Sequence, residues 1–503
     1  MNMTDSFRGM DMEFNIKDYT IETRPFINGE YRTPINCKFV HRVSSVTGCP
    51  LPDLYACNKQ DVDEAVSVAK NTFSDGVWSK LEPTERKKVM LKLADLMEEH
   101  IVELASLDTY ETGRAFNNYM YDSIPKAIEA IRYFAEAIDK IYDKAIMPRE
   151  EAFCVIVREP LGVVGIITPW NDPLVVASWK FVPALLMGNS VVIKPAEQSS
   201  LSLLRVASLA KEAGVPDGVF NVITGYGEET GKELALHKDV DGIFFTGSSK
   251  VGKMLYQYAG QSNMKKVALE CGGKGPYIVT NHFSDIKLVA ETLAQNMFYN
   301  QGQICSAPSK VIVHESVKNM FIEYLKKASN RFVPGNPYNI NNRVGCVVSK
   351  KQYDRVQSYI ELGKSETNSY YIARGKDDLQ DGACGISPAI FWDLPDTSSL
   401  LSDEIFGPVV CIQTYCDIND AIAMANDTNY GLAGAVWTED LNEAYYVAKQ
   451  VKVGLFHINS YGEDDNCSPF GGFKESGNGK DKSVFAFDEY SEQKSVWMKM
   501  RRE

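Results

Sequence analysis

The chain has 503 residues, 44% hydrophobic and 24% charged, which is ordinary for a globular protein of two or three domains. Its formal net charge of −13 argues against nucleic acid and anionic membranes as partners, and no apolar run approaches the ~20 residues of a membrane helix. Eleven cysteines without a CxxC pair, six dispersed histidines without metal-ligand spacing and no N-terminal leader pattern predict a cytoplasmic protein without a catalytic metal.

Helical and strand-like patterns alternate along the chain, which indicates an α/β fold. Three segments have the amphipathic pattern of helices: residues 61–75, 83–107 and 125–143. Four short apolar runs that predict strands follow: residues 163–168, 190–195, 219–224 and 242–246. A helix that ends at Gly214 fits between the second and third runs, so we expect parallel strands with right-handed crossovers, as in a Rossmann-like dinucleotide fold.

Two glycine patterns could bind the phosphates of a dinucleotide. Gly227 and Gly231 follow a strand-like run and imitate the dinucleotide fingerprint, but their spacing differs from it. Gly247, Ser248 and Gly252 open a predicted helix, where free backbone N–H groups and a hydroxyl could bind a pyrophosphate. The second pattern could also be an ordinary strand-to-helix turn.

Lys194 and Glu197 lie at the end of the second strand-like run. An acidic side chain there could accept a hydrogen bond from a ribose hydroxyl and would repel a 2′-phosphate. This favours NAD, with NADP possible but less favoured. In another context the two residues would be read as a solvated ion pair on a loop.

Cys305 is the candidate nucleophile. It lies in the polar, glycine-flanked run FYNQGQICSAPSK at residues 298–310, whereas a structural thiol is usually surrounded by aliphatic residues. A buried structural cysteine remains the alternative. Glu270 stands between an apolar run and a Gly-Gly pair, where burial would raise its pKa toward the range of a general base.

Several segments with compatible spacing resemble the NAD(P)-dependent aldehyde dehydrogenases. In chain order they are TPWN (168–171), KPAEQSS (194–200), FTGSSKVG (245–252), ALECGGK (268–274), FYNQGQICSA (298–307), EIFGP (404–408) and PFGGFKESG (469–477). The likeness runs from residue 26 to the C-terminus and is greatest to γ-glutamyl-γ-aminobutyraldehyde dehydrogenases. It leaves residues 1–25 without a role. One departure is Cys271 in place of the usual leucine, either a small hydrophobic substitution or a second functional thiol.

The resemblance implies the catalytic residues. The Cys305 thiolate would attack the aldehyde, and the Asn171 amide and the Cys305 N–H would stabilise the oxyanion, which requires the two residues to be close. After hydride transfer, Glu270 would activate the water that hydrolyses the thioester. Relatives that transfer the acyl group to coenzyme A lack this glutamate. Lys180 matches a lysine proposed to support proton movement, with a snorkelling surface lysine as the alternative.

The resemblance also implies the cofactor site. It favours the Gly247 pattern for the phosphates, and it places Glu404 and Phe406 at the nicotinamide ribose and ring. The expected cofactor residues are Thr168, Pro169, Trp170, Lys194, Glu197, Gly227, Gly231, Phe245, Gly247, Ser248, Gly252, Gly272, Gln352, Glu404 and Phe406.

Acidic residues near the expected substrate tunnel suggest a cationic aldehyde. Asp172 stands where the family commonly has an aromatic residue, and Asp122 matches a carboxylate of aminoaldehyde-oxidising relatives. Several acids around one tunnel would attract a cation, although they could also be solvated loop residues in an acidic chain. The expected substrate contacts are Asp122, Asp172, Trp179, Ile304, Ser306, Glu463, Asp464 and Phe470.

The family architecture implies three parts. They are an NAD-binding domain (1–137 and 161–272), a catalytic domain (273–485) and a β-rich oligomerisation flap (138–160 and 486–503). The flap segments 152–160 and 493–500 would join subunits into a dimer or a tetramer.

The predicted function is NAD-dependent oxidation of an ω-amino or γ-glutamylamino aldehyde from putrescine breakdown. A broad-specificity aliphatic or aromatic aldehyde dehydrogenase and a betaine aldehyde dehydrogenase are alternatives. Outside oxidoreductases, a cysteine acyl-transfer enzyme that pairs Cys305 with a histidine and a non-catalytic scaffold remain open.

Overall fold

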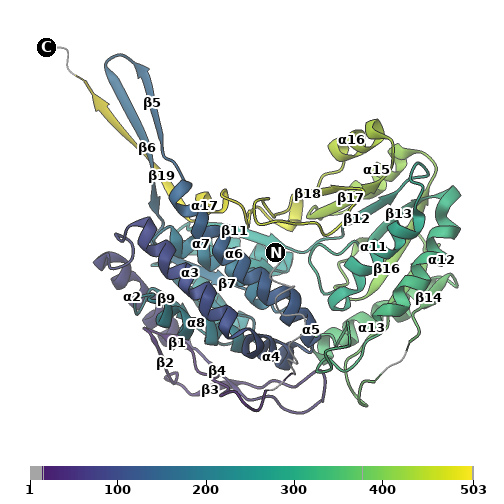
Figure 1. Cartoon of the computed structure of the whole chain (residues 1–503), viewed down its shortest axis with the longest axis horizontal. Coiled ribbons are helices and arrows are strands. Elements are labelled where there is room, and N and C mark those ends of the chain that lie inside the picture. Colours follow the sequence, from purple (N-terminus) through teal and green to yellow (C-terminus); the bar gives the residue numbers. More distant parts are fainter. Residues whose placement is uncertain (1–13, 15, 376–377, 501–503) are drawn as a thin grey trace.

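The computed structural model describes residues 14, 16–375 and 378–500 of the chain. Two seven-stranded sheets, each covered by helices, lie side by side, and a narrow three-stranded arm projects from one of them (Figure 1). The described helices include none long and apolar enough to cross a membrane.

The first sheet has the strand order β11-β10-β7-β8-β9-β1-β2. Its strands are β1 (Phe26–Ile27), β2 (Glu30–Tyr31), β7 (Val163–Ile167), β8 (Ser190–Lys194), β9 (Phe220–Val222), β10 (Gly242–Gly247) and β11 (Lys266–Cys271). Strands β7 to β11 pair in parallel, which confirms the four strands expected from the apolar runs, whereas β1 and β2 pair antiparallel. Such a sheet places the carboxyl ends of its parallel strands on one edge, where ligands bind in open α/β sheets.

Helices cover both faces of this sheet because its strands are apolar on both sides. Val164 and Ile166 of β7 pack into one hydrophobic cluster, and Val163 and Ile167 into another. The first cluster includes α3 (Pro83–Glu99), α4 (Ile101–Thr112), α5 (Phe116–Asn118), α6 (Ile124–Ala137), α7 (Pro173–Leu186), α8 (Leu201–Ala213) and α17 (Ala486–Glu489). The second includes α2 (Lys59–Asp75), α9 (Lys232–Leu236) and α10 (Ser249–Gln261).

Two helix predictions are wrong in extent. The single helix expected over residues 83–107 is two helices, because His100 leaves helical geometry at φ −102° and ψ 18°. The His100 ring is held by Glu103 and Arg205, contacts that the amphipathic pattern does not reveal. The helix expected to end at residue 143 ends at Ala137 and continues only as a 3-10 turn to residue 140.

The second sheet has the order β14-β15-β16-β13-β12-β17-β18, with only β14 antiparallel among its described strands. Its strands are β12 (Pro276–Val279), β13 (Lys310–His314), β14 (Tyr370–Ile372), β15 (Ala389–Trp392), β16 (Val409–Tyr415), β17 (Ala433–Trp437) and β18 (Leu455–Ile458). Its helices are α11 (Ile286–Phe298), α12 (Lys318–Ser329), α13 (Lys350–Glu366), α14 (Ser399–Ser402), α15 (Ile418–Asn426) and α16 (Leu441–Gln450). A separate hairpin joins β3 (Lys38–Val40) to β4 (Leu54–Ala56).

The arm is a sheet of β5 (Lys144–Arg149), β6 (Ala152–Pro160) and β19 (Ser491–Lys499). The predicted flap segments 152–160 and 493–500 therefore pair with each other, although they are far apart in the sequence. Among the described strands β19 pairs only with β6, so none of them covers its other edge.

Candidate active site

A cavity of about 540 Å³ brings most of the expected catalytic and substrate residues together. Of the residues expected from the sequence, its walls include Asp122, Asn171, Asp172, Trp179, Ile304, Cys305, Ser306, Asp464 and Phe470. Glu463 is exposed on the neighbouring loop and is not part of the wall.

Cys305 lies in the loop between the 3-10 turn at residues 299–302 and strand β13. The expected proximity to Asn171 is found, because the side-chain Nδ2 of Asn171 donates to the carbonyl oxygen of Gln303 at 3.1 Å. Burial raises the pKa of the Cys305 thiol to about 12, and the carboxyl groups of Glu404 and Glu270 add to the shift. The resting thiol is therefore protonated at neutral pH and becomes a nucleophile only when a base or a nearby positive charge assists it.

Glu270 is the penultimate residue of strand β11 and is 3% exposed. Neither of its carboxylate oxygens has a hydrogen-bond partner among the described residues. The carboxylate fits against two glycines, since a Cβ on Gly471 or Gly479 would lie 2.6 or 3.2 Å from its Oε1. Burial, with a smaller contribution from Asp481, raises the pKa of Glu270 well above its usual value.

Lys180 is buried in the middle of α7, at 2% exposure, so the alternative of a snorkelling surface lysine is wrong. Its Nζ lies 2.8 and 3.0 Å from the two carboxylate oxygens of Asp481. Asp481 and Lys180 both act on the charge of Glu270. These three groups thus form a buried, electrostatically connected set.

Cys271 follows Glu270 in β11 but lies in a different environment. It packs in the apolar cluster that includes Leu255 and Leu269, and its Sγ would be 3.2 Å from a Cβ on Gly252. Burial raises the pKa of this thiol to about 12. These contacts favour a small hydrophobic residue over a second functional thiol.

The expected cofactor residues gather at the carboxyl ends of β7, β8, β10 and β11. The Lys194 ammonium lies 3.5 Å from the Glu197 carboxylate, and Gly231 leaves room beside the lysine stem, where a Cβ would be 3.4 Å from its Cδ. Ser248 caps α10 by accepting a hydrogen bond from the N–H of Val251. The remaining residues of the set at these strand ends are Thr168, Pro169, Trp170, Phe245, Gly247 and Gly272. Gly252 lies in the first turn of α10, and Gly227 opens the turn that follows β9.

A second group of the set comes from the other sheet. The Glu404 carboxylate accepts from the N–H of Gly273 at 3.1 Å, and it lies where a Cβ on Gly272 would stand. Burial raises the pKa of Glu404 to about 7. The rings of Phe406 and Trp170 meet edge to face at 5.3 Å between centroids. Gln352, from α13, donates to the carbonyl oxygen of Phe406 at 2.8 Å.

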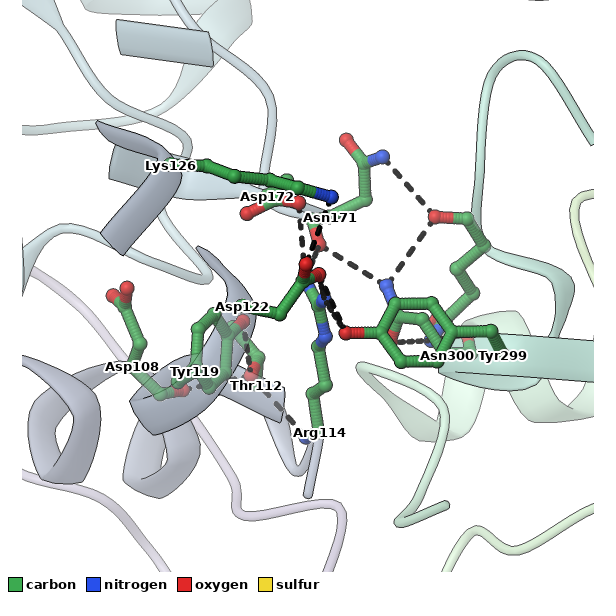
Figure 2. A network of polar contacts seen from close by, with 11 residues as sticks. Asp108, Thr112, Arg114, Tyr119, Asp122, Lys126, Asn171, Asp172, Tyr299 and Asn300 are labelled. Atoms are coloured by element: carbon green, nitrogen blue, oxygen red, sulfur yellow. Dashed lines mark hydrogen bonds and ion pairs between the residues drawn. The ribbon is translucent and has the colours of Figure 1, made fainter. Parts of the chain in front are cut away.

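The sequence reasoning missed the cations that accompany the acidic residues. Arg114, 3% exposed, lies 3.2 Å from the carboxylate of Asp172 and 3.9 Å from that of Asp122 (Figure 2). Lys126 contacts Asp122 at 2.8 Å, one helical turn away. Burial alone would raise the pKa of Asp122, but these two cations outweigh it and lower the pKa.

The third carboxylate of the wall, Asp464, is paired with Lys482, which also lies over the ring of Trp179 at 5.3 Å. Each acid of the wall therefore has a basic partner. Arg114 follows the glycine that ends α4, and Lys482 is an isolated lysine in a loop. Neither sequence context indicates that the residue pairs with an acid of the cavity wall.

The fold and these residues define the class of protein, an α/β enzyme with Cys305 in the wall of a cavity. The chain matches the Aldehyde dehydrogenase family over residues 34–496 and belongs to that family.

Individual relatives extend the likeness over nearly the whole chain. The NADP/NAD-dependent aldehyde dehydrogenase PuuC of Escherichia coli is 43% identical over 95% of this chain and 96% of its own. The aminoacetaldehyde dehydrogenase of Pseudomonas aeruginosa is 40% identical over 94% and 95%. Among solved structures, the γ-glutamyl-γ-aminobutyraldehyde dehydrogenase of Burkholderia cenocepacia superposes with a TM-score of 0.92 at 42% identity, covering 96% of this chain and 98% of that one.

Proposed function

We propose that this protein oxidises an ω-amino or γ-glutamylamino aldehyde to the carboxylic acid, with NAD as the hydride acceptor and putrescine breakdown as its setting. The observation that carries the proposal is one cavity whose walls include Cys305 and Asn171 together with paired charges. The names of the relatives support the same substrate class, since they include an aminoacetaldehyde and a γ-glutamyl-γ-aminobutyraldehyde dehydrogenase.

The first half of the reaction belongs to Cys305. Its sulfur attacks the aldehyde carbon and forms a thiohemiacetal, whose oxyanion needs donors where the charge develops. One N–H of the Asn171 amide is engaged by the carbonyl oxygen of Gln303, which orients the group and leaves the second N–H available. Since burial opposes ionisation of the thiol, the sulfur has to lose its proton to solvent in the cavity as it attacks the aldehyde.

The residues at the strand ends fit NAD. The buried Oγ1 of Thr246 has no partner among the described residues, whereas the space beside Gly272 is taken by the carboxylate of Glu404. Lys194 and Glu197 would hold the adenosine ribose, and Glu404 would hold the nicotinamide ribose. When bound, NAD supplies the acceptor for the hydride that leaves the substrate carbon.

The second half of the reaction belongs to Glu270. The thioester on Cys305 needs a water made nucleophilic, and a buried carboxylate with a raised pKa and two free oxygens is suited to accept the proton. The Lys180 ammonium would stabilise the ionised form of Glu270, and Asp481 would hold that ammonium in place through their ion pair. Release of a free acid follows.

Cofactor preference follows from Glu197. Its carboxylate is three-quarters buried beside Lys194, where it would accept from a ribose hydroxyl and repel a 2′-phosphate. We therefore propose NAD as the preferred cofactor and NADP as a poorer one.

The wall charges suit a substrate that is polar at the end opposite the aldehyde. The three acids of the cavity wall are matched by three basic side chains, so their charges cancel. Because both signs of charge are present, the wall offers an acid to bind an ammonium group and a cation to bind a carboxylate group. A γ-glutamylamino aldehyde carries both groups. Lys126 is the most accessible of the cations, with 58% of its side chain exposed.

A broad-specificity aldehyde dehydrogenase is the second candidate. The rings of Trp179 and Phe470 pack at 5.4 Å and give the cavity an apolar part that any slender aldehyde could occupy. An indole-3-acetaldehyde dehydrogenase of Pseudomonas syringae, solved with NAD+ and IAA, is 42% identical, with a TM-score of 0.93 over 96% of this chain and 98% of that one.

The deciding experiment compares aldehydes by the absorbance of NADH formed. The panel is γ-glutamylaminobutanal, 4-aminobutanal, 4-guanidinobutanal, betaine aldehyde, succinic semialdehyde and propanal. We expect the amino-derived aldehydes to have the highest kcat/KM. Asp172→Asn with Asp464→Asn should raise KM for these substrates and spare propanal. Highest activity with propanal, or equal effects on all substrates, would contradict amine recognition.

We propose that the arm joins subunits into a dimer or a tetramer. Strand β19 offers an open edge, and Trp497 on it is 58% exposed, which is unusual for so large an apolar side chain. All eleven cysteines are unpaired, as a reducing compartment would leave them, and we propose a cytoplasmic location on that ground.

A further inference from the structure

Arg114 contacts both Asn171 and Tyr299, which come from different segments of the chain (Figure 2). Its Nη1 donates to the carbonyl oxygen of Asn171 at 3.3 Å and contacts the Asp172 carboxylate at 3.2 Å. Its Nη2 donates to the hydroxyl of Tyr299 at 2.9 Å, on the segment that leads to Cys305. One buried guanidinium therefore connects both sides of the site.

A second contact reinforces the same connection. The Nδ2 of Asn300 donates to the carbonyl oxygen of Asn171 at 3.1 Å, and the Asn171 amide donates back to Gln303 at 3.1 Å. Asn300 adopts a left-handed conformation, φ 47°, which asparagine tolerates better than most residues. Arg114 and Asn300 thus fix the Asn171 peptide from two directions, and the orientation of its side chain follows from that of the peptide.

The shape of the guanidinium matters here. It has to reach a carbonyl oxygen, a carboxylate and a hydroxyl at once, and its planar fork also lies over the rings of Tyr119 and Tyr299 at 4.8 and 5.0 Å. Lysine, a single charged point on a flexible stem, cannot hold three acceptors in one plane. The hydroxyl of Tyr299 in turn donates a hydrogen bond to the Asp122 carboxylate at 2.8 Å.

We propose that Arg114 is a positioning residue that holds the Asn171 amide in line with Cys305 for stabilisation of the thiohemiacetal oxyanion. This rests on the proposed function, in which Asn171 is the oxyanion donor. A displaced donor would slow formation and collapse of the thiohemiacetal while leaving the cofactor residues untouched, because those residues lie at the strand ends and not in this network.

The experiment measures the rate of the first turnover, as NADH formed after rapid mixing, in Arg114→Gln and Arg114→Lys. We expect a fall of about 10- to 100-fold in both, because a misplaced group costs up to about 10² and loss of a single oxyanion donor costs about 10² to 10³. The lysine variant should not rescue the rate, although it keeps the charge. A primary deuterium isotope effect on kcat should appear with the 1-deutero aldehyde, and the Kd for NAD should stay unchanged.

A double variant separates positioning from folding. Arg114→Gln leaves the Asp172 carboxylate without its buried cation and should lower Tm, and adding Asp172→Asn should restore Tm without restoring the first-turnover rate. If the double variant regains the rate, Arg114 serves only to neutralise Asp172 and the proposal is overturned. Arg132→Gln is the matched control, since Arg132 also binds two carboxylates but lies outside the cavity wall, with 32% of its side chain exposed.

Asn171→Ala distinguishes this inference from the function on which it rests. A fall of about 10² to 10³ in its first-turnover rate, with wild-type rates in both Arg114 variants, would overturn the positioning role alone. A wild-type rate in Asn171→Ala would overturn the assigned oxyanion donor and the positioning role together. Falls in all three variants, largest in Asn171→Ala, would support both.

Discussion

Exchange of Glu270 for glutamine should stop the enzyme after one turnover. The amide has almost the same size as the carboxylate, and neither carboxylate oxygen makes a hydrogen bond within the described residues, so the change removes no contact. It removes only the capacity to accept a proton. The thioester on Cys305 should therefore form at a near-normal rate and then persist, since Glu270 is the only carboxylate we assign to its hydrolysis.

The size of the effect follows from the role. General base catalysis contributes about 10² to 10⁴ in rate, which at about 1.4 kcal/mol per tenfold is roughly 3–5 kcal/mol of activation free energy. We expect kcat to fall by this factor. Stability should change little, or rise, because a buried carboxylate whose pKa is raised by burial is replaced by a neutral group.

The assay mixes the variant with NAD and the best aldehyde of the panel and follows NADH from milliseconds to minutes. A burst close to one NADH per subunit, followed by a slow phase, is the expected trace, and mass spectrometry should find the acyl group on Cys305. Cys271→Ala is the control, because that thiol packs in an apolar cluster away from the cavity. A Glu270→Gln enzyme without a burst, or one with wild-type steady-state turnover, would refute the assigned role.

Three further variants test charge and assembly. Asp481→Asn should move the acid limb of the kcat–pH profile to lower pH, because it removes a negative charge that raises the pKa of Glu270 and leaves Lys180, which lowers that pKa. An acid limb that stays in place or moves to higher pH would contradict the coupling between Asp481 and Glu270. The same variant should lose about 3–5 kcal/mol in the free energy of unfolding, measured in urea, because it leaves a buried cation unpaired. Glu197→Ser should raise kcat/KM for NADP about tenfold or more by removing a like charge, and an unchanged NADP/NAD ratio would remove the basis for the preference. Trp497→Asp should shift the mass measured by light scattering toward that of a single subunit, whereas an unchanged mass would place the subunit interface elsewhere.

The sequence alone was sufficient for the parts of the protein that depend on local pattern. Apolar runs of strand length predicted β7 to β10 because buried parallel strands are apolar on both faces, whatever lies beside them. The polar, glycine-flanked setting of Cys305 and the apolar run before Glu270 made both residues candidates, because the neighbours of a residue in sequence indicate how exposed or buried its side chain is. Motif order then identified the family.

The partners of the charged residues were decided only by the tertiary structure. A surface position remained the alternative for Lys180 until α7 placed it against Asp481, 301 positions further along the chain. Asp122 and Asp172 counted as attractive charges until Arg114, on a different loop, was found between them. Burial and pairing depend on which elements pack together, and a residue's neighbours in sequence do not specify its neighbours across a packed interface.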